Sequence, residues 1–255
     1  MRQLVRSPKT QLGILLFSIF LTAFVNNPLL KIVFLYLLLH LSAALSDFVF
    51  LKIKGIPLSF PSAALVSASI ITLVVNPNLP WHQFFVIAVL AIASKNFLRV
   101  SGRHIFNPAG FGLFAGSLMF PDAISWWGTS FQQFRVQNLE FIIYFLILLS
   151  PGLISIVRMR RHRIILSFLI VYFLLNLISN FKFQISNFFD PTLLFFSLVM
   201  LPEPMTTPNR HYQQILFGVF IAFFSVLISS PISNFEADPL ITSLLIGNLI
   251  FFKFR

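Results

Sequence analysis

The chain has 255 residues, of which 57% are hydrophobic and only 10% charged, and its mean hydropathy is +0.89. This composition is typical of a polytopic membrane protein and leaves no room for a separate soluble domain. The absence of cysteine excludes disulfides, thiolate metal sites, thiolate-ligated iron–sulfur clusters and a cysteine nucleophile within this chain. Any redox centre must therefore be non-thiolate or lie on a partner.

The formal net charge of +11 could indicate binding to nucleic acid. However, Lys and Arg occur in short loops between apolar runs rather than in one soluble region, which is the pattern of membrane topology. We therefore expect a lipid bilayer, and no nucleic acid, as the surroundings of this chain.

Ten apolar segments follow a basic start that carries Arg2, Arg6 and Lys9. No small-residue cleavage pattern follows the first segment, so we interpret it as a membrane helix rather than a signal peptide. A span needs about 20 mostly apolar residues. The predicted segments are 11–26, 29–48, 59–76, 80–96, 105–120, 139–157, 163–180, 187–202, 212–230 and 237–252.

The distribution of cations supports this count. If both termini lie inside, the outer loops hold only three of the 18 Lys and Arg residues, namely Lys31, Arg135 and Lys182. Such a strong positive-inside bias predicts a multi-pass plasma-membrane protein with ten spans and both termini cytoplasmic. The short third, fifth and eighth segments carry Pro, Asn or Gly near their ends and could be broken or re-entrant.

Two of these short segments indicate an internal repeat. Phe60–Leu65 opens a run that closes at Asn76-Pro77, and Phe189–Leu194 opens one that closes at Pro202–Pro204. Each is the third segment of a five-helix half, and an odd number of helices would invert one half relative to the other. We expect a single integral membrane domain, 1–255, with possible inverted halves 11–136 and 137–255.

The stretch Ser101–Pro108 places several hydrogen-bond donors between two apolar runs. Gly102 allows a tight backbone path, Arg103 offers a planar fork for phosphate or carboxylate, and Asn107 can donate and accept at the start of the next helix. The alternative is that the cations only set the topology and that Asn107 caps a helix.

A second polar stretch, Leu201–Arg210, contains three prolines that forbid a continuous helix. Glu203, Thr206, Thr207 and Arg210 would therefore crowd together beside free backbone carbonyls. An ordinary proline-rich loop with solvated charges is the alternative.

Two further features have mainly structural interpretations. Asp190 is the one acid that our boundaries place inside an apolar run, which makes it a candidate for an ion pathway, but Asp-Pro is also a good helix start. The pair Trp126 and Trp127 is typical of interfacial anchors. The histidines are too scattered for a metal cluster, and they are His40, His82, His104, His162 and His211.

Taken together, five motifs resemble a known family. They are Lys95, Gly102–Pro108, Pro61–Ala63, Glu203–Pro208 and Ile215–Gly218. By their residues and their order along the chain, they are similar to the D subunit of the Rnf electron-transport complex and to its relative, the B subunit of the sodium-translocating NADH:quinone reductase. The resemblance spans most of the chain.

The resemblance implies ten helices in two inverted halves, flavin binding, and electron transfer coupled to ion movement in a prokaryotic membrane. The chain would then be a non-autonomous subunit that works with other electron-transport subunits or a soluble flavin or iron–sulfur reductase. Members with covalent FMN attach it to a threonine in a Ser-Gly-Ala-Thr-type motif after the fifth helix. That loop here has Thr129 as its only threonine and lacks the motif, so we expect no covalent FMN.

We therefore expect a non-covalent flavin, FMN or riboflavin. Its expected contacts are Arg103, His104, Asn107, Glu203, Thr206, Thr207 and Arg210. The alternative function is a small-solute channel or transporter on the same scaffold, which would need polar side chains across the membrane. The sparse candidates are Ser67, Ser69, Thr72, Asn176 and Ser197.

Overall fold

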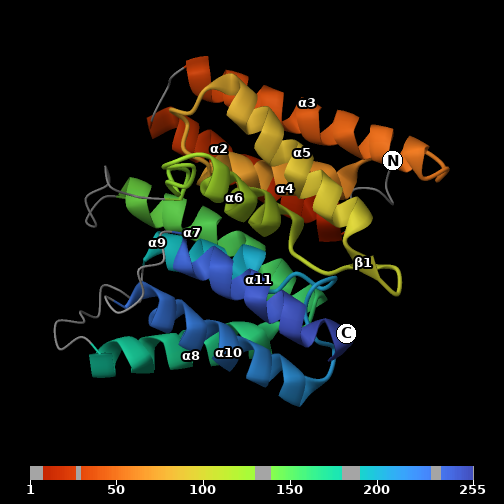
Figure 1. The fold of residues 1–255 in the computed structure, drawn as a ribbon. Helices are drawn as coiled ribbons and strands as arrows, with labels where there is room; N and C mark the ends of the chain where they lie inside the picture. The colour runs from red at the N-terminus through yellow and green to blue at the C-terminus, as the bar shows by residue number, and fades with distance from the viewer. Residues whose placement is uncertain (1–7, 27–29, 130–138, 180–189, 231–236, 255) are drawn as a thin grey trace.

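The computed structural model describes residues 8–26, 30–129, 139–179, 190–230 and 237–254 (Figure 1). These ranges form ten α-helices and one two-stranded hairpin. The α-helices are α2 Pro8–Asn26, α3 Leu30–Ile53, α4 Ser62–Val74, α5 Trp81–Phe97, α6 Pro108–Met119, α7 Leu139–Leu153, α8 His162–Ser179, α9 Pro191–Phe195, α10 His211–Ser229 and α11 Pro239–Phe251. The prediction of an all-helical chain is confirmed, and each helix lies within one of the ten predicted segments or overlaps it closely.

Shorter elements complete the chain. Two π-helical turns extend α7 and α9, and a 3-10 turn follows α11. They are η1 Ile154–Arg158, η3 Phe196–Met200 and η4 Phe252–Phe254. The antiparallel strands β1, Arg99–Val100, and β2, Arg103–His104, form the hairpin.

Three short helices begin at an Asx-Pro pair. Asn107, Asp190 and Asp238 each precede a proline, and each side chain accepts a hydrogen bond from a backbone N–H of the first helical turn. This is a favourable N-terminus because the side chain satisfies an orphan donor and proline needs none. The capping interpretation of Asp190 is confirmed, with its Oδ1 3.0 Å from the nitrogen of Leu193. Its role in an ion pathway stays a prediction.

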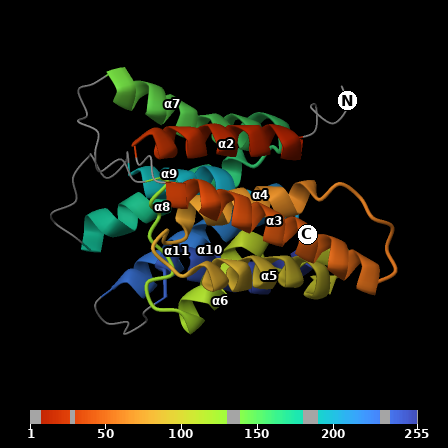
Figure 2. The ribbon, with the colours of Figure 1, turned by 90° about the horizontal axis from the view of Figure 1, so that it is seen from above.

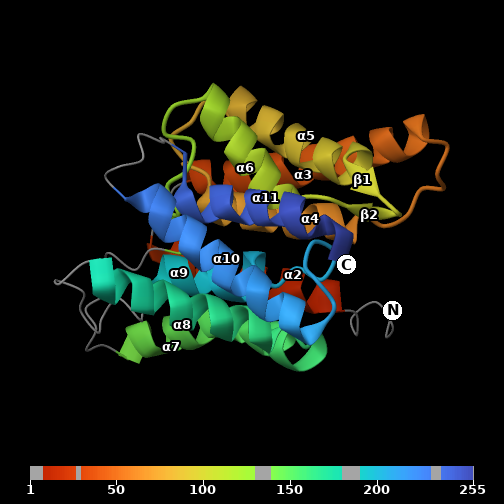
Figure 3. The same ribbon diagram turned by 60° about the horizontal axis from the view of Figure 1, so that its bottom comes forward.

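The helices form one bundle (Figures 1, 2 and 3). Helices α3, α4, α5 and α6 pack together in one part, and α8 packs extensively along α10 in another. Helix α11 contacts both α6 and α10, and α2 contacts both α4 and α7. We call the end of the bundle that carries the β1–β2 hairpin the hairpin end; α11 and η4 finish there.

Two glycines allow helices to approach at backbone distance. A Cβ on Gly112 would lie 2.7 Å from the carbonyl oxygen of Ile87, across the α5–α6 contact. A Cβ on Gly218 would lie 2.6 Å from that of Ile164, across the α8–α10 contact. Small residues at such crossings are typical of helix packing in membranes, where close van der Waals contact replaces the hydrophobic driving force.

Large apolar side chains also cover the outside of the bundle. On α3, for example, Leu37, Leu41 and Leu45 are each more than half exposed, whereas Leu35 and Leu39 on the other face are fully buried. A soluble protein rarely exposes so much contiguous apolar surface. By length and hydropathy, α3 and α10 are the described helices that meet the criterion for a membrane span, and the other apolar helices are shorter.

Two predictions about polar residues were wrong. Asp190 is not the one acid inside the predicted segments, because 29–48, 139–157 and 237–252 also contain Asp47, Glu140 and Asp238. Asp47, in α3, is 3% exposed and is paired with Lys95 at 2.8 Å. Trp126 is not an interfacial anchor: it is 8% exposed, and its Nε1 donates to Asp238 Oδ2 at 2.7 Å. Trp127 is half-buried, and its Nε1 donates to the carbonyl of Thr72 at 2.7 Å. The indoles tie the segment after α6 to α4 and α11. Arg135 and Lys182, which the topology prediction used, lie outside the described residues.

Candidate functional site

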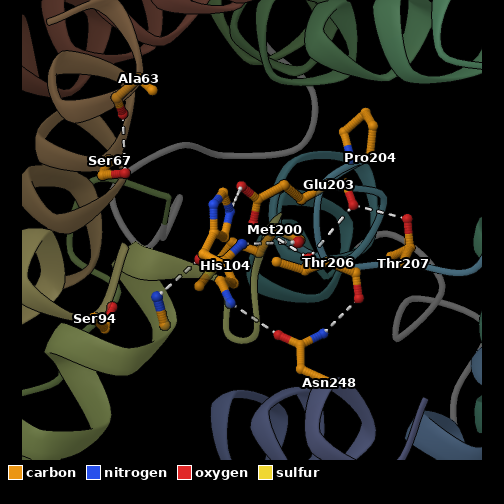
Figure 4. Close-up of polar contacts among 12 residues, drawn as sticks. Ala63, Ser67, Ser94, His104, Met200, Glu203, Pro204, Thr206, Thr207 and Asn248 are labelled. Carbon is orange, nitrogen blue, oxygen red and sulfur yellow. Dashed lines mark hydrogen bonds and ion pairs between the residues drawn. The ribbon is translucent and has the colours of Figure 1, made fainter. Parts of the chain in front are cut away.

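The two polar stretches singled out in the sequence meet at the hairpin end (Figure 4). The Nε2 of His104, at the end of β2, lies 3.0 Å from Oε1 of Glu203, which belongs to the proline-rich loop after η3. His104 is buried and the Glu203 side chain is 23% exposed. A carboxylate from one half of the chain is thereby held by an imidazole from the other.

The hairpin turn places His104 at this position. Ser101 and Gly102 have φ angles of 49° and 81°, the left-handed backbone that a two-residue hairpin turn requires. Gly102 adopts it without strain, because it has no Cβ. Arg99 then pairs with His104 across the hairpin, and the backbone N–H of Ile105 donates to the carbonyl of Leu98 at 2.8 Å.

Asn107 joins three parts of the structure. Its Oδ1 caps α6 by accepting from the nitrogen of Gly110 at 2.9 Å, and its Nδ2 donates to the carbonyl of Met200 in η3 at 3.1 Å. Its backbone N–H donates to Oδ1 of Asn248 in α11 at 2.9 Å. The Nδ2 of Asn248 in turn donates to the carbonyl of Thr206 at 3.3 Å. Two buried amides therefore hold the proline-rich loop between α6 and α11.

The proline-rich loop folds back on Glu203. Thr206 Oγ1 lies 3.3 Å from Oε2 of Glu203, and Thr207 Oγ1 donates to the Glu203 carbonyl at 2.7 Å. Both threonines are fully buried. From the other side, the guanidinium of Arg161, which is 6% exposed, donates to the carbonyl of Pro208 and to Oδ1 of Asn209. The loop is a fixed element rather than a solvated linker.

The two π-helical turns face each other beside this loop. Pro151 lies near the end of α7 and cannot donate a backbone hydrogen bond, and the wider turn η1 follows it. In η1, Ser155 Oγ donates to the carbonyl of Leu198 in η3 at 2.8 Å. π-helical turns often occur at functional sites, because the extra residue redirects carbonyls that an α-helix would use internally.

A cavity of about 770 Å³ lies between these elements. Its walls come from α2, α4, the start of α6, both π-helical turns and the proline-rich loop. Most of the lining is apolar, from side chains such as Leu12, Val66, Ile70, Val199 and Met205. Polar groups from Ser62, Ser67, Asn107, Ser155, Glu203, Lys9 and Arg158 complete it.

The structure divides the predicted flavin contacts into two sets. Asn107 and Glu203 line the cavity, and His104, Thr206 and Thr207 surround Glu203. Arg103 lies outside the cavity lining and borders a second pocket. Arg210 is exposed at the start of α10, and Asp190 caps α9.

Three residues that hold the site were not identified from the sequence. Asn248 lies in the last apolar run, where a lone amide beside Gly247 could have marked it as a buried polar contact. Ser155 follows the Pro151 break, and Arg161 was counted only as a topological charge.

The hydroxyls considered for solute conduction are engaged within their helices. Ser67, Thr72 and Ser197 each donate to a carbonyl one turn earlier in the chain, at 3.1, 2.8 and 3.1 Å. Asn176 does the same at 2.8 Å, and Ser69, which bonds to Leu65, also contacts His40. Ser67 is the member of this group that also lines the cavity.

These features define a helical membrane protein with short Asx-Pro-capped helices and a polar-edged cavity at one end. The chain belongs to the NQR2, RnfD, RnfE family, whose model matches residues 3–252. It is therefore an integral membrane subunit of the Rnf/Nqr type, as the sequence resemblance predicted. No curated protein sequence matches the chain.

Proposed function

We propose that this subunit takes part in electron transfer by holding a flavin non-covalently in the cavity. The observation that supports it is the cavity itself, whose volume of about 770 Å³ lies in the range of cofactor sites. Its apolar walls fit the faces of a planar ring system, and the Asn107 amide and the Glu203 carboxylate can meet polar ring edges. A flavin would supply the redox chemistry that this chain's own side chains lack.

The chain's own residues would fix the edge of the ring. Asn107 is held by its bonds to Gly110, Met200 and Asn248, and Glu203 by His104 and Thr206. Groups locked in this way lose little conformational freedom on binding. Arg103 and Arg210 are left out of this proposed set, because neither lines the cavity.

The fold supports the proposed inverted halves, 11–136 and 137–255. Helices α4 and α6 are the third and fifth of the first half, and both begin beside the cavity at the hairpin end. Helices α9 and α11 hold the same places in the second half, and Figure 1 draws both as starting at the opposite end. Inverted repeats commonly bind ligands where such short helices meet. With both termini cytoplasmic, the hairpin end would face the cytoplasm, where a soluble reductase or other subunits can reach it.

The test is to purify the chain with its co-expressed partner proteins, precipitate it with acid and separate the released flavins by chromatography. We expect FMN or riboflavin in the supernatant and none on the polypeptide. Val66→Trp places a large side chain in the cavity and should remove most of the bound flavin. The matched control is Val49→Trp, because Val49 lies on the exposed surface of α3. Flavin missing from the unmodified complex, together with solute flux in liposomes, would support the transporter alternative instead.

A further inference from the structure

A second pocket, of about 570 Å³, lies between the hairpin and the end of α11. It is lined by Val100, Ser101, Arg103, Phe252 and Lys253. Two of these five side chains are cations, one is a hydroxyl and none is an acid. The left-handed turn at 101–102 fixes one wall, and the η4 turn forms the other. None of these five residues lines the cavity of about 770 Å³ described above.

Arg103 lines this pocket, and one nitrogen of its guanidinium lacks a hydrogen-bond partner in the described part of the chain. Its Nη1 is buried and has no hydrogen-bond partner among the described residues. Leaving a buried donor unsatisfied is costly, so such groups usually mark a missing acceptor. Within the described part of the chain, the two ion pairs are Lys95–Asp47 and His104–Glu203, and neither involves Arg103 or Lys253.

The surroundings of the pocket are strongly positive. Arg161 is close enough to Arg103 to feel its charge: burial lowers the pKa of Arg161, and the positive charge of Arg103 adds to the effect. The Nε of Arg161 is likewise buried without a partner in the described residues. Arg99 donates to the carbonyl of Gly102 on the hairpin. The nearby carboxylate of Glu203 is already held by His104 and Thr206.

We propose that this pocket binds the phosphate group of an anionic phospholipid. A planar guanidinium fork, an ammonium and a hydroxyl form a donor set that suits phosphate oxygens. The pocket also has an apolar rim from Val100 and Phe252. Leu98, Ile250 and Phe254, each two residues away from one of them in the sequence, are exposed. A soluble anion would gain nothing from that rim, whereas acyl chains can lie along it. The excess of cations selects a lipid with net negative charge over a zwitterionic one.

The experiment counts phospholipids that stay with the detergent-purified complex after washing, by mass spectrometry, with phosphatidylglycerol and phosphatidylcholine of equal chain length supplied. We expect phosphatidylglycerol to be retained preferentially. Arg103→Gln should weaken its retention about tenfold, the effect of losing one charge-assisted hydrogen bond. Lys253→Gln should act in the same direction, and Arg103→Lys should restore part of the loss. Lys52→Gln removes an exposed cation at the end of α3 and should change nothing.

Three results would overturn the proposal. One is an equal loss of lipid in Arg103→Gln and Lys52→Gln, because the net charge of the protein rather than the pocket would then explain lipid retention. Another is inorganic phosphate displacing phosphatidylglycerol at matched concentration, which would indicate a soluble phosphate ligand. The third is unchanged lipid together with loss of a partner subunit from the Arg103→Gln complex, which would make this a protein-docking surface. Flavin content measured on the same samples should be unaffected, so the two proposals can fail separately.

Discussion

His104 and Glu203 lie 99 positions apart in the sequence, yet Nε2 and Oε1 are 3.0 Å apart in the structure. This pair joins the hairpin to the proline-rich loop at the edge of the cavity. Removing either partner leaves the other partly buried without this contact. In a double-mutant cycle with His104→Leu and Glu203→Gln, we expect a coupling energy of about 1–3 kcal/mol. This coupling energy would be measured by thermal unfolding in detergent. If the destabilisations of the two single variants simply add in the double variant, the pair contributes nothing to stability.

The side chain of Asn107 should stabilise the fold through both its donor, Nδ2, and its acceptor, Oδ1. Asn107→Ala removes the α6 cap and the bond to Met200, so we expect a loss of about 2–4 kcal/mol in unfolding free energy. Asn107→Asp is the informative control, because it keeps the cap but places an acceptor against the Met200 carbonyl. If Asn107→Asp unfolds at the same temperature as the unmodified protein, the cap alone accounts for the effect.

The buried pair in α3 and α5 offers a different test. Asp47 accepts from Lys95 at 2.8 and 2.9 Å and from Asn96 at 2.9 Å. Asp47→Ala leaves the ammonium without its partner and should lower stability by about 3–5 kcal/mol, whereas replacing both by apolar residues should recover much of the loss. The measurement compares the melting temperature of Asp47→Ala with that of the double variant Asp47→Leu with Lys95→Met. A double variant as unstable as the single one would contradict it.

Gly218 should tolerate no side chain. Besides the Ile164 carbonyl, an added Cβ would meet Ser167 Oγ at 2.1 Å. We expect Gly218→Ala to force α8 and α10 apart at a cost of about 1–3 kcal/mol. Gly13→Ala is the matched control, because the nearest atom to its Cβ is a Val66 methyl at 3.8 Å. It should be neutral or stabilise the helix by about 0.5–1 kcal/mol.

The sequence predicted the helices better than it predicted their contacts. Apolar runs, together with the pairs Asn107-Pro108 and Asp190-Pro191, mark where helices begin, because capping is a local property. The meeting of Ser101–Pro108 with Leu201–Arg210 followed from the family resemblance and not from any local pattern. Trp126 was misinterpreted because a tryptophan at the end of a span has the same sequence appearance whether it faces lipid or a buried carboxylate.

Asn248 and Ser155 show what local patterns cannot contain. Each is one polar residue in an apolar run, and its partner lies far along the chain, Thr206 for one and Leu198 for the other. Only the packing of η1 against η3, and of α11 against the loop, makes these contacts. Arg161 is similar, because nothing in a cluster of arginines indicates which one is buried.

The wide turn η3, Phe196–Met200, sets the direction in which the carboxylate of Glu203 points. A π-helical turn holds one residue more than an α-helical turn in the same path. If the same residues continued as an ordinary α-helix instead, everything that follows would be rotated by about 100° and pushed forward by about 1.5 Å. Glu203 would then point away from His104 although its own neighbours were unchanged. The direction of this side chain is therefore set by the number of residues before it as much as by their chemistry.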